Sequence, residues 1–234
     1  MGDEVKMLEV NKIYCANCLD LMKDIPDKSV DLILTDPPFG IGMHIQIGKK
    51  KGERGDKWDA SDWDNFRPDK RYFDELFRVS KNQIIWGGNY FDLPATRCFL
   101  IWDKVQRIDF ADCEMAWTSF GTSARIYSFA RSNMQGFRFP ERKHPTQKPV
   151  PLYQWCIKNY SKETDLILDP FCGSGTTCVA AKLLGRNFIG IDISPEYCKI
   201  AENRLRDTEE SLFKAVSRCP ANMTQPLDGR NNER

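Results

Sequence analysis

Short apolar runs alternate with segments of helical spacing along this chain, most clearly in its second half. Period and length predict strands at residues 11–14, 30–35, 83–86, 99–102, 113–118, 126–129, 166–168 and 188–191. Helices are predicted at residues 18–22, 71–80, 147–160, 175–184 and 195–206. Strands that alternate with helices predict one α/β domain, built on a single doubly wound, mostly parallel sheet with helices on both faces.

Two stretches fall outside this alternation. Residues 41–68 are polar, Gly-rich and charged, and a connection of that length is typical of a lid, a binding loop or disorder. After about residue 207 the composition becomes polar. We therefore predict a folded domain over residues 1–207 and a partly disordered tail over residues 208–234.

The strand predicted at residues 30–35 ends in a turn that presents a carboxylate and an aromatic ring. Asp36 is followed by Pro37 and Pro38, which cannot donate to a sheet ladder, and then by Phe39. In open α/β sheets, ligands bind at the carboxyl ends of the strands. A large ring after a turn gains little in solvent but suits stacking on a flat base. A turn without any further role is the alternative for the bare Asp-Pro-Pro.

A second candidate site lies in residues 169–177, where a strand leads through a glycine-rich turn into a helix. Gly173 and Gly175 allow a ligand to approach the backbone, and Asp192 ends the next strand, where its carboxylate can accept ribose hydroxyls. This pattern indicates a nucleoside cofactor. The third glycine of a dinucleotide fingerprint is replaced by Cys178, and no P-loop motif is present. A purely structural tight turn is the alternative.

Composition narrows the class of protein. The chain has 234 residues, 41% of them hydrophobic, which is enough for one good core. No apolar run reaches membrane-spanning length, and the first ten residues are charged rather than signal-like. The nine cysteines are an odd number, which favours reduced thiols in a cytoplasmic protein. Cys15 and Cys18 form a lone C-x-x-C in a chain with two histidines, so we predict no metal site.

The net charge of +1 means that any nucleic-acid surface must come from local clusters of positive charge. One cluster lies in the long loop, and a second lies between residues 125 and 148. A solvated face is the alternative, above all for the loop cluster alone. The residues predicted to contact nucleic acid are Lys49, Lys50, Lys51, Arg54, Arg131, Arg138, Arg142 and Lys143.

The D-P-P-F stretch at 36–39, paired with F-x-G-x-G at 171–175, resembles the amino-group DNA methyltransferases. These enzymes transfer the methyl group of S-adenosylmethionine to adenine N6 or cytosine N4. The order of the two motifs is that of the subgroup in which the catalytic motif comes first. Stretches at 12–19, 86–90 and 144–149 resemble further segments of the family. The resemblance covers about residues 11–206 and implies a Rossmann-like methyltransferase fold with permuted motif order.

The resemblance also implies how the chain is divided. The catalytic half spans about residues 11–143 and the cofactor half about residues 144–207. The implied catalytic residues are Asp36, Pro37, Pro38 and Phe39. The implied cofactor-binding residues are Asn17, Cys18, Asp36, Thr146, Lys148, Asp169, Phe171, Gly173, Gly175, Thr176 and Asp192. The implied partner is double-stranded DNA, from which the target base is flipped into the site.

Three departures from the family pattern affect these expectations. Phe39 stands where tyrosine is commoner, and the ring is kept. Asn17 stands where aspartate is commoner, and its carbonyl can still accept a hydrogen bond. The span between the motifs is short for a separate target-recognition domain, so recognition must use loops. Because cytosine-N4 members more often have serine at the position of Asp36, the resemblance favours adenine N6.

Two other functions remain open from the sequence. The first is an amino-methyltransferase that acts on RNA. The second is a nucleotide-binding Rossmann module without methyl transfer, such as a dehydrogenase, against which Cys178 argues. The sequence does not decide between a monomer and a homodimer, and it identifies neither the recognition sequence nor a paired restriction enzyme.

Overall fold

Most of the predicted strands and helices are present in the computed structural model, which describes residues 8–41, 67–105, 111–130 and 147–217. The strands are β1 Lys12–Cys15, β2 Val30–Thr35, β3 Ser80–Trp86, β4 Phe99–Asp103, β5 Cys113–Thr118, β6 Arg125–Ser128, β7 Leu166–Asp169 and β8 Asn187–Asp192. The α-helices are α1 Cys18–Met22, α3 Lys70–Val79, α5 Val150–Tyr160, α6 Thr176–Leu183 and α7 Pro195–Ser217. A short 3-10 helix, η2, spans Gly88–Tyr90.

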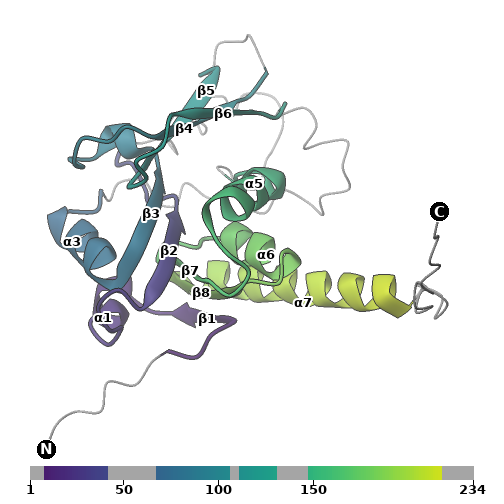
Figure 1. Ribbon diagram of the computed structural model, residues 1–234. Helices are drawn as coiled ribbons and strands as arrows, with labels where there is room; N and C mark the ends of the chain where they lie inside the picture. Colours follow the sequence, from purple (N-terminus) through teal and green to yellow (C-terminus); the bar gives the residue numbers. More distant parts are fainter. Residues whose placement is uncertain (1–7, 42–66, 106–110, 131–146, 218–234) are drawn as a thin grey trace, which may run out of the picture.

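All of these strands join in one eight-stranded sheet with the order β1-β8-β7-β2-β3-β5-β4-β6 (Figure 1). The strands from β1 to β3 in this order are parallel to one another. Strand β5 is antiparallel to both β3 and β4, and β6 pairs with β4 in parallel at the edge. The predicted mostly parallel sheet is therefore confirmed.

The order of the strands reverses between β2 and β7. From β2 the chain moves outward to β3, whereas from β7 it moves in the opposite direction to β8. Strands β2 and β7 are paired directly, with Leu32 opposite Ile167. In open α/β sheets, the crevice beyond the carboxyl ends of the strands at such a reversal is where ligands bind.

Helices cover both faces of the sheet, as the alternation predicted. Helices α1 and α3 lie on one face, and α5, α6 and α7 lie on the other (Figure 1). Side chains of β3 alternate between the two cores, because successive residues of a strand point to opposite faces. Ile84 and Trp86 join the core beneath α5 to α7, whereas Ile85 joins the core beneath α1 and α3.

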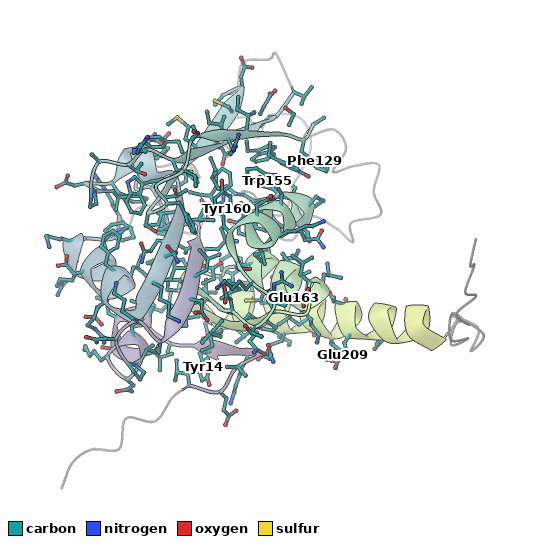
Figure 2. The ribbon with its side chains drawn as sticks, viewed as in Figure 1. Tyr14, Phe129, Trp155, Tyr160, Glu163 and Glu209 are labelled. Atoms are coloured by element: carbon teal, nitrogen blue, oxygen red, sulfur yellow. The ribbon has the colours of Figure 1, made fainter. Side chains whose placement is uncertain are left out.

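The edge of the sheet carries a row of partly buried aromatic rings (Figure 2). Tyr127 of β6 stacks on Trp155 of α5 with ring centroids 5.2 Å apart, and it stacks on Phe129 at 6.2 Å. Trp155 meets Tyr160 edge to face at 6.3 Å. Because Tyr127 belongs to β6 and Trp155 belongs to α5, their stacking attaches the edge strand β6 to helix α5.

Three predicted boundaries differ from the structure by three or more residues. Strand β3 begins at Ser80 rather than residue 83, and residue 80 was predicted as the end of the preceding helix. Helix α5 begins at Val150 rather than residue 147, because a residue before proline disfavours helical geometry and Pro149 follows Lys148. Helix α7 continues to Ser217, past the predicted helix end at 206 and the predicted domain boundary at 207. Its extension is supported by an ion pair of 3.1 Å between Glu209 and Lys182 of α6.

Within the described residues, none of the helices combines the length and the apolar character needed to cross a membrane.

Candidate active site

Two aspartates lie at the point where the strand order reverses. Asp36 follows the last residue of β2 directly, and Asp169 is the last residue of β7. The hydroxyl of Thr35 donates a hydrogen bond of 2.8 Å to Oδ1 of Asp169, so the two strand ends are joined side chain to side chain. The two predicted motifs are thereby brought together at the carboxyl ends of two central strands.

Asp169 is buried and accepts its hydrogen bonds from uncharged groups. The hydroxyls of Thr35 and Thr177 and the backbone N–H of Phe171 all donate to its carboxyl group. Burial raises the pKa of Asp169 to about 7, although these hydrogen bonds act in the opposite direction. Asp169 therefore ties β2, β7 and α6 together, and its carboxyl group takes up a proton more readily than an ordinary aspartate does.

Asp36 has a charged partner instead. The ammonium group of Lys148, whose side chain is 5% exposed, contacts Oδ2 of Asp36. Burial opposes the positive charge of Lys148, but the carboxylates of Asp36 and Glu114 outweigh it and raise the pKa of Lys148. Lys148 therefore remains an ammonium group beneath Asp36.

The ion pairs continue away from Asp36 along the antiparallel part of the sheet. Oε2 of Glu114, on β5, lies 3.1 Å from Nζ of Lys148, and Oε1 lies 2.7 Å from Nζ of Lys104. Burial would raise the pKa of Glu114, but attraction by Lys148 and Lys104 lowers it to about 2. Two carboxylates and two ammonium groups thus alternate in one chain of contacts.

The ring of Phe39 is supported by the stretch at residues 86–90. It stacks on Tyr90 with centroids 4.8 Å apart and an interplanar angle of 22°. Gly87 has φ +65, and a Cβ at this position would lie 2.0 Å from Cε1 of Phe39. Glycine is therefore required at position 87 both for its backbone conformation and for the ring above it.

The glycine-rich turn is fixed to the end of β8 through Asp192. The backbone N–H groups of Gly173 and Ser194 each donate a 2.8 Å hydrogen bond to the carboxylate of Asp192. Burial raises the pKa of Asp192. A Cβ at Gly173 would meet no described heavy atom within 4 Å, so the turn borders open space at this point.

Helix α7 holds the other side of the same turn. Gly175 has φ +76, and a Cβ there would lie 2.7 Å from Cβ of Ala201, so this glycine allows α7 to pack closely. Arg204 donates to the carbonyl of Ser174 and to the hydroxyl of Thr176, and burial lowers the pKa of Arg204 to about 10. The turn is therefore held from below, which leaves Gly173 as its open part.

Asn17 and Cys18 lie beside Asp192, across the β1–β8 pair. The side-chain carbonyl of Asn17 caps α1 by accepting a 2.9 Å hydrogen bond from the N–H of Leu19. The N–H of Ala16 donates to the backbone carbonyl of Asp192 at 3.0 Å. Cys18 is buried, and burial raises the pKa of its thiol to about 12. The sequence predicted both residues as cofactor contacts, and the structure places them at the end of the sheet that holds Asp192.

The arrangement fits a nucleoside cofactor. Asp192 accepts one backbone hydrogen bond on each carboxylate oxygen, and each oxygen retains capacity to accept another from a ribose hydroxyl. The open backbone at Gly173 lies beside it, and Asp36 lies farther along the same strand edge. Among the described residues, no group of His, Cys, Asp and Glu side chains could hold a metal ion.

Sequence reasoning missed Glu114 and Lys104. Glu114 is the second residue and the one charged residue of β5, and this isolated charge is the signal that could have pointed to it. Nothing in the sequence indicated that β5 would lie beside β3 and bring Glu114 to Lys148. Tyr90 was part of a noted stretch, but its stacking on Phe39 was not predicted.

Several predicted residues lie outside the described part of the chain. They are Thr146 and all of the residues predicted to contact nucleic acid, namely Lys49, Lys50, Lys51, Arg54, Arg131, Arg138, Arg142 and Lys143. Most of the long loop predicted at residues 41–68 also falls there.

Comparison with known proteins identifies the family. The N6/N4 family model described as DNA methylase matches residues 85–203, which is about half of the chain. The chain is 27% identical to the type II methyltransferase M.HpaI of Haemophilus parainfluenzae over an alignment of 269 positions, which covers 92% of this chain and 82% of that protein. It is 28% identical to the type II methyltransferase M.HinfI of Haemophilus influenzae over 250 residues, covering 85% of this chain and 69% of that protein.

Solved structures show the same fold. The crystal structure of the M1.HpyAVI–SAM complex superposes with a TM-score of 0.53 at 24% identity, covering 83% of this chain and 98% of that one. The cytosine-N4-specific PvuII DNA methyltransferase superposes with a TM-score of 0.55 at 16% identity, covering 88% and 92%. The predicted fold class is thus confirmed. The match of the family model shows that this protein belongs to the N6/N4 DNA methylase family.

Proposed function

We propose that this protein transfers the methyl group of S-adenosylmethionine to the exocyclic amine of a flipped base in double-stranded DNA, at adenine N6. The observation that carries the proposal is the position of Asp36. Its carboxylate lies where the strand order reverses, next to the supported ring of Phe39 and on the same edge as the turn at Gly173. One edge thus offers an amine acceptor, a stacking surface and a nucleoside site.

The cofactor would be held mainly by the second half of the chain. Asp192 would accept the ribose hydroxyls, the backbone at Gly173 would allow close approach, and Asn17 would accept from the adenine amino group. Phe171, Thr176 and Cys18 would complete the walls of this site, and the buried Asp169 would hold the strand ends beneath it. When bound, S-adenosylmethionine supplies an electrophilic methyl group on a positively charged sulfur.

The first half would hold and activate the amine. An exocyclic amine is a weak nucleophile because its lone pair is delocalised into the ring of the base. A hydrogen bond from this amine to the Asp36 carboxylate, with a second to the carbonyl of Pro37, would stabilise positive charge that develops on nitrogen. Pro38 would keep the turn rigid, and Phe39 would stack on the base and fix its plane.

The DNA would be held by the predicted basic residues of the two clusters, which lie outside the described part of the chain. Their contacts to phosphate would supply affinity that falls with salt concentration. Adenine is preferred over cytosine because the family's cytosine-N4 enzymes more often have serine in place of Asp36. Both amines present the same two hydrogens, so the mechanism is the same for either base.

The test is to incubate the protein with duplex DNA and S-adenosylmethionine that carries an isotopically labelled methyl group. Digestion to nucleosides followed by mass spectrometry should find the label in N6-methyladenine. Label in N4-methylcytosine would overturn the choice of base, and label in 5-methylcytosine would overturn the mechanism. Transfer to RNA alone would change the substrate. Single-molecule sequencing of the methylated duplex would then read the recognition sequence.

A matched measurement addresses the alternative without methyl transfer. A thermal-shift comparison should show stabilisation by S-adenosylmethionine and none by nicotinamide dinucleotides, because Cys178 occupies the third glycine position of the dinucleotide motif. Stabilisation by a nicotinamide cofactor alone would replace the methyltransferase with a dinucleotide-binding module.

A further inference from the structure

We propose that Glu114 is a positioning residue for methyl transfer: anchored by Lys104, it holds Lys148 so that this one ammonium group is shared between two carboxylates. The inference rests on the proposed function, because it concerns how Asp36 is presented to the target amine.

The geometry of the contacts carries this inference. Nζ of Lys148 contacts Oδ2 of Asp36 on one side and lies 3.1 Å from Oε2 of Glu114 on the other. The second oxygen of Glu114 is held by Lys104 at 2.7 Å. Lys104 and Lys148 are both buried, so these charges interact in surroundings where water screens them little. Neither ammonium group can leave its partners without a large desolvation cost.

Aromatic rings restrict the same ammonium group further. Nζ of Lys148 lies 5.8 Å from the ring centroid of Phe39 and 5.7 Å from that of Trp86. Trp86 in turn stacks on Tyr153 of α5, with centroids 6.5 Å apart. The position of Lys148 is therefore coupled both to the acceptor Asp36 and to the ring that would stack on the target base.

Sharing the ammonium group determines how strongly Asp36 can accept a hydrogen bond from the target amine. If Lys148 faced Asp36 alone, the whole attraction of a buried cation would fall on one carboxylate. That carboxylate would then be a weaker acceptor for the amine and would be drawn toward Lys148. Because Glu114 takes part of this attraction, Asp36 keeps acceptor strength while Lys148 still fixes its orientation. Glu114 thus acts on the reaction through Lys148.

A purely structural role for Glu114 is the competing explanation, since its contacts also join β5 to the segment before α5. A structural role would lower stability and leave the pH dependence of the remaining activity unchanged. A positioning role would make the rate depend on the charge of Lys148, so the lower pKa of Lys148 without Glu114 would move the pH dependence of the remaining activity. Among the described residues, the titratable groups that act on Lys148 are Asp36 and Glu114. The buried Tyr153 lies near both of these carboxylates, and Lys104 lies behind Glu114.

The principal experiment compares Glu114→Gln with wild type in single-turnover methyl transfer across pH. The glutamine keeps the size of the side chain but removes its charge and replaces one of its two acceptor oxygens with a donor NH2 group. We expect the rate constant at saturating cofactor and DNA to fall roughly 10- to 100-fold, the cost of a misplaced reacting group, with KM values nearly unchanged. Loss of Glu114 removes one of the two carboxylates that raise the pKa of Lys148 above its ordinary 10.5. A decline in rate on the alkaline side should therefore begin at lower pH in the variant.

Glu75→Gln is the matched control. The side chain of Glu75 is about as exposed as that of Glu114. It pairs with Arg78 at 2.8 Å on α3, which lies on the other face of the sheet. Its loss should leave both the rate constant and the pH profile as in wild type. If Glu114→Gln behaves like Glu75→Gln, the inference is overturned, whereas absence of methyl transfer by the wild-type protein would overturn the proposed function instead.

Two further variants keep the test decisive if Glu114→Gln does not fold. Glu114→Asp retains the charge at shorter reach, so it should lower the rate constant without moving the alkaline decline. Lys104→Met leaves Glu114 facing Lys148, so the alkaline decline should not move to lower pH. An alkaline decline that begins at lower pH in both of these variants would contradict the assignment.

Discussion

Asp36 and Asp169 stand at the ends of neighbouring strands, yet their surroundings differ in kind. Asp36 contacts the buried ammonium group of Lys148. Asp169 receives hydrogen bonds from two hydroxyls and one backbone N–H, and burial raises its pKa to about 7. The two are close enough for the negative charge of Asp36 to contribute to that rise.

Under the proposed function, this difference separates a chemical role for Asp36 from a structural role for Asp169. A carboxylate beside an ammonium group keeps its charge and can accept a hydrogen bond from an amine. A buried carboxyl group among neutral donors carries a proton easily and serves to join strands and helix. The identity of the residue and its place at the strand end are the same, so the partners decide the role.

Changing Asp169 should have the largest effect on stability. The raised pKa means that the stabilising contribution of Asp169 is complete below the ordinary aspartate pKa of 3.8 and is lost as pH rises through about 7. At ~1.4 kcal/mol per pKa unit, this loss is on the order of 4 kcal/mol between pH 4 and pH 8. Urea unfolding should show that Asp169→Asn gains stability relative to wild type by about this amount over that range.

Parallel curves of unfolding free energy against pH for wild type and Asp169→Asn would contradict the buried, readily protonated state of Asp169.

A third carboxylate, Asp192, extends the comparison to cofactor binding. Asp192→Ala removes the acceptor that fixes Gly173 and would hold the ribose. We expect S-adenosylmethionine to bind about 1.5–3 kcal/mol more weakly, the range for a lost hydrogen bond to a charged group. Isothermal titration calorimetry measures this directly. Glu196→Ala, on the first turn of α7, should bind as wild type. Wild-type affinity in Asp192→Ala would remove Asp192 from the cofactor site.

The smallest effects on methyl transfer should come from substitutions that change the ring of Phe39 or displace it. Phe39→Tyr should keep methyl-transfer activity within about a factor of two, because the stacking face is retained. Phe39→Ala should lose about 1–3 kcal/mol of base stacking, measured in kcat/KM for DNA. Gly87→Ala should approach the same loss, because its Cβ would occupy the position of the ring. S-adenosylmethionine affinity should stay unchanged in all three variants, and a fall in it would place Phe39 in the cofactor site.

Much of this arrangement could be predicted because it is local in sequence. A strand followed by two prolines has to end at Asp36, and a strand followed by a glycine turn has to present Asp169 at the same edge. The mostly parallel sheet with helices on both faces follows from the alternation of strands and helices. These features depend on neighbouring residues and on the general geometry of parallel sheets.

The ion pairs around Asp36 could not be predicted, because they depend on distant parts of the chain. Lys148 reaches Asp36 across more than a hundred positions, and Glu114 comes from a strand whose antiparallel pairing with β3 had no signal in the sequence. The protonation of Asp169 was also hidden, since it depends on burial and on the hydroxyls of Thr35 and Thr177. Contacts of this kind are set by packing rather than by local pattern.

The central claim is that Asp36 acts on the target amine whereas Asp169 supports the fold around it. Its most direct test is the single-turnover rate of methyl transfer to duplex DNA by Asp36→Asn and Asp169→Asn, two variants that make the same substitution. The account predicts that Asp36→Asn loses about 10²–10³-fold while still binding S-adenosylmethionine, as expected for a lost electrostatic contact in the transition state. Asp169→Asn should remain within about tenfold of wild type at pH 8. Equal losses in the two variants, or a larger loss in Asp169→Asn, would contradict the account.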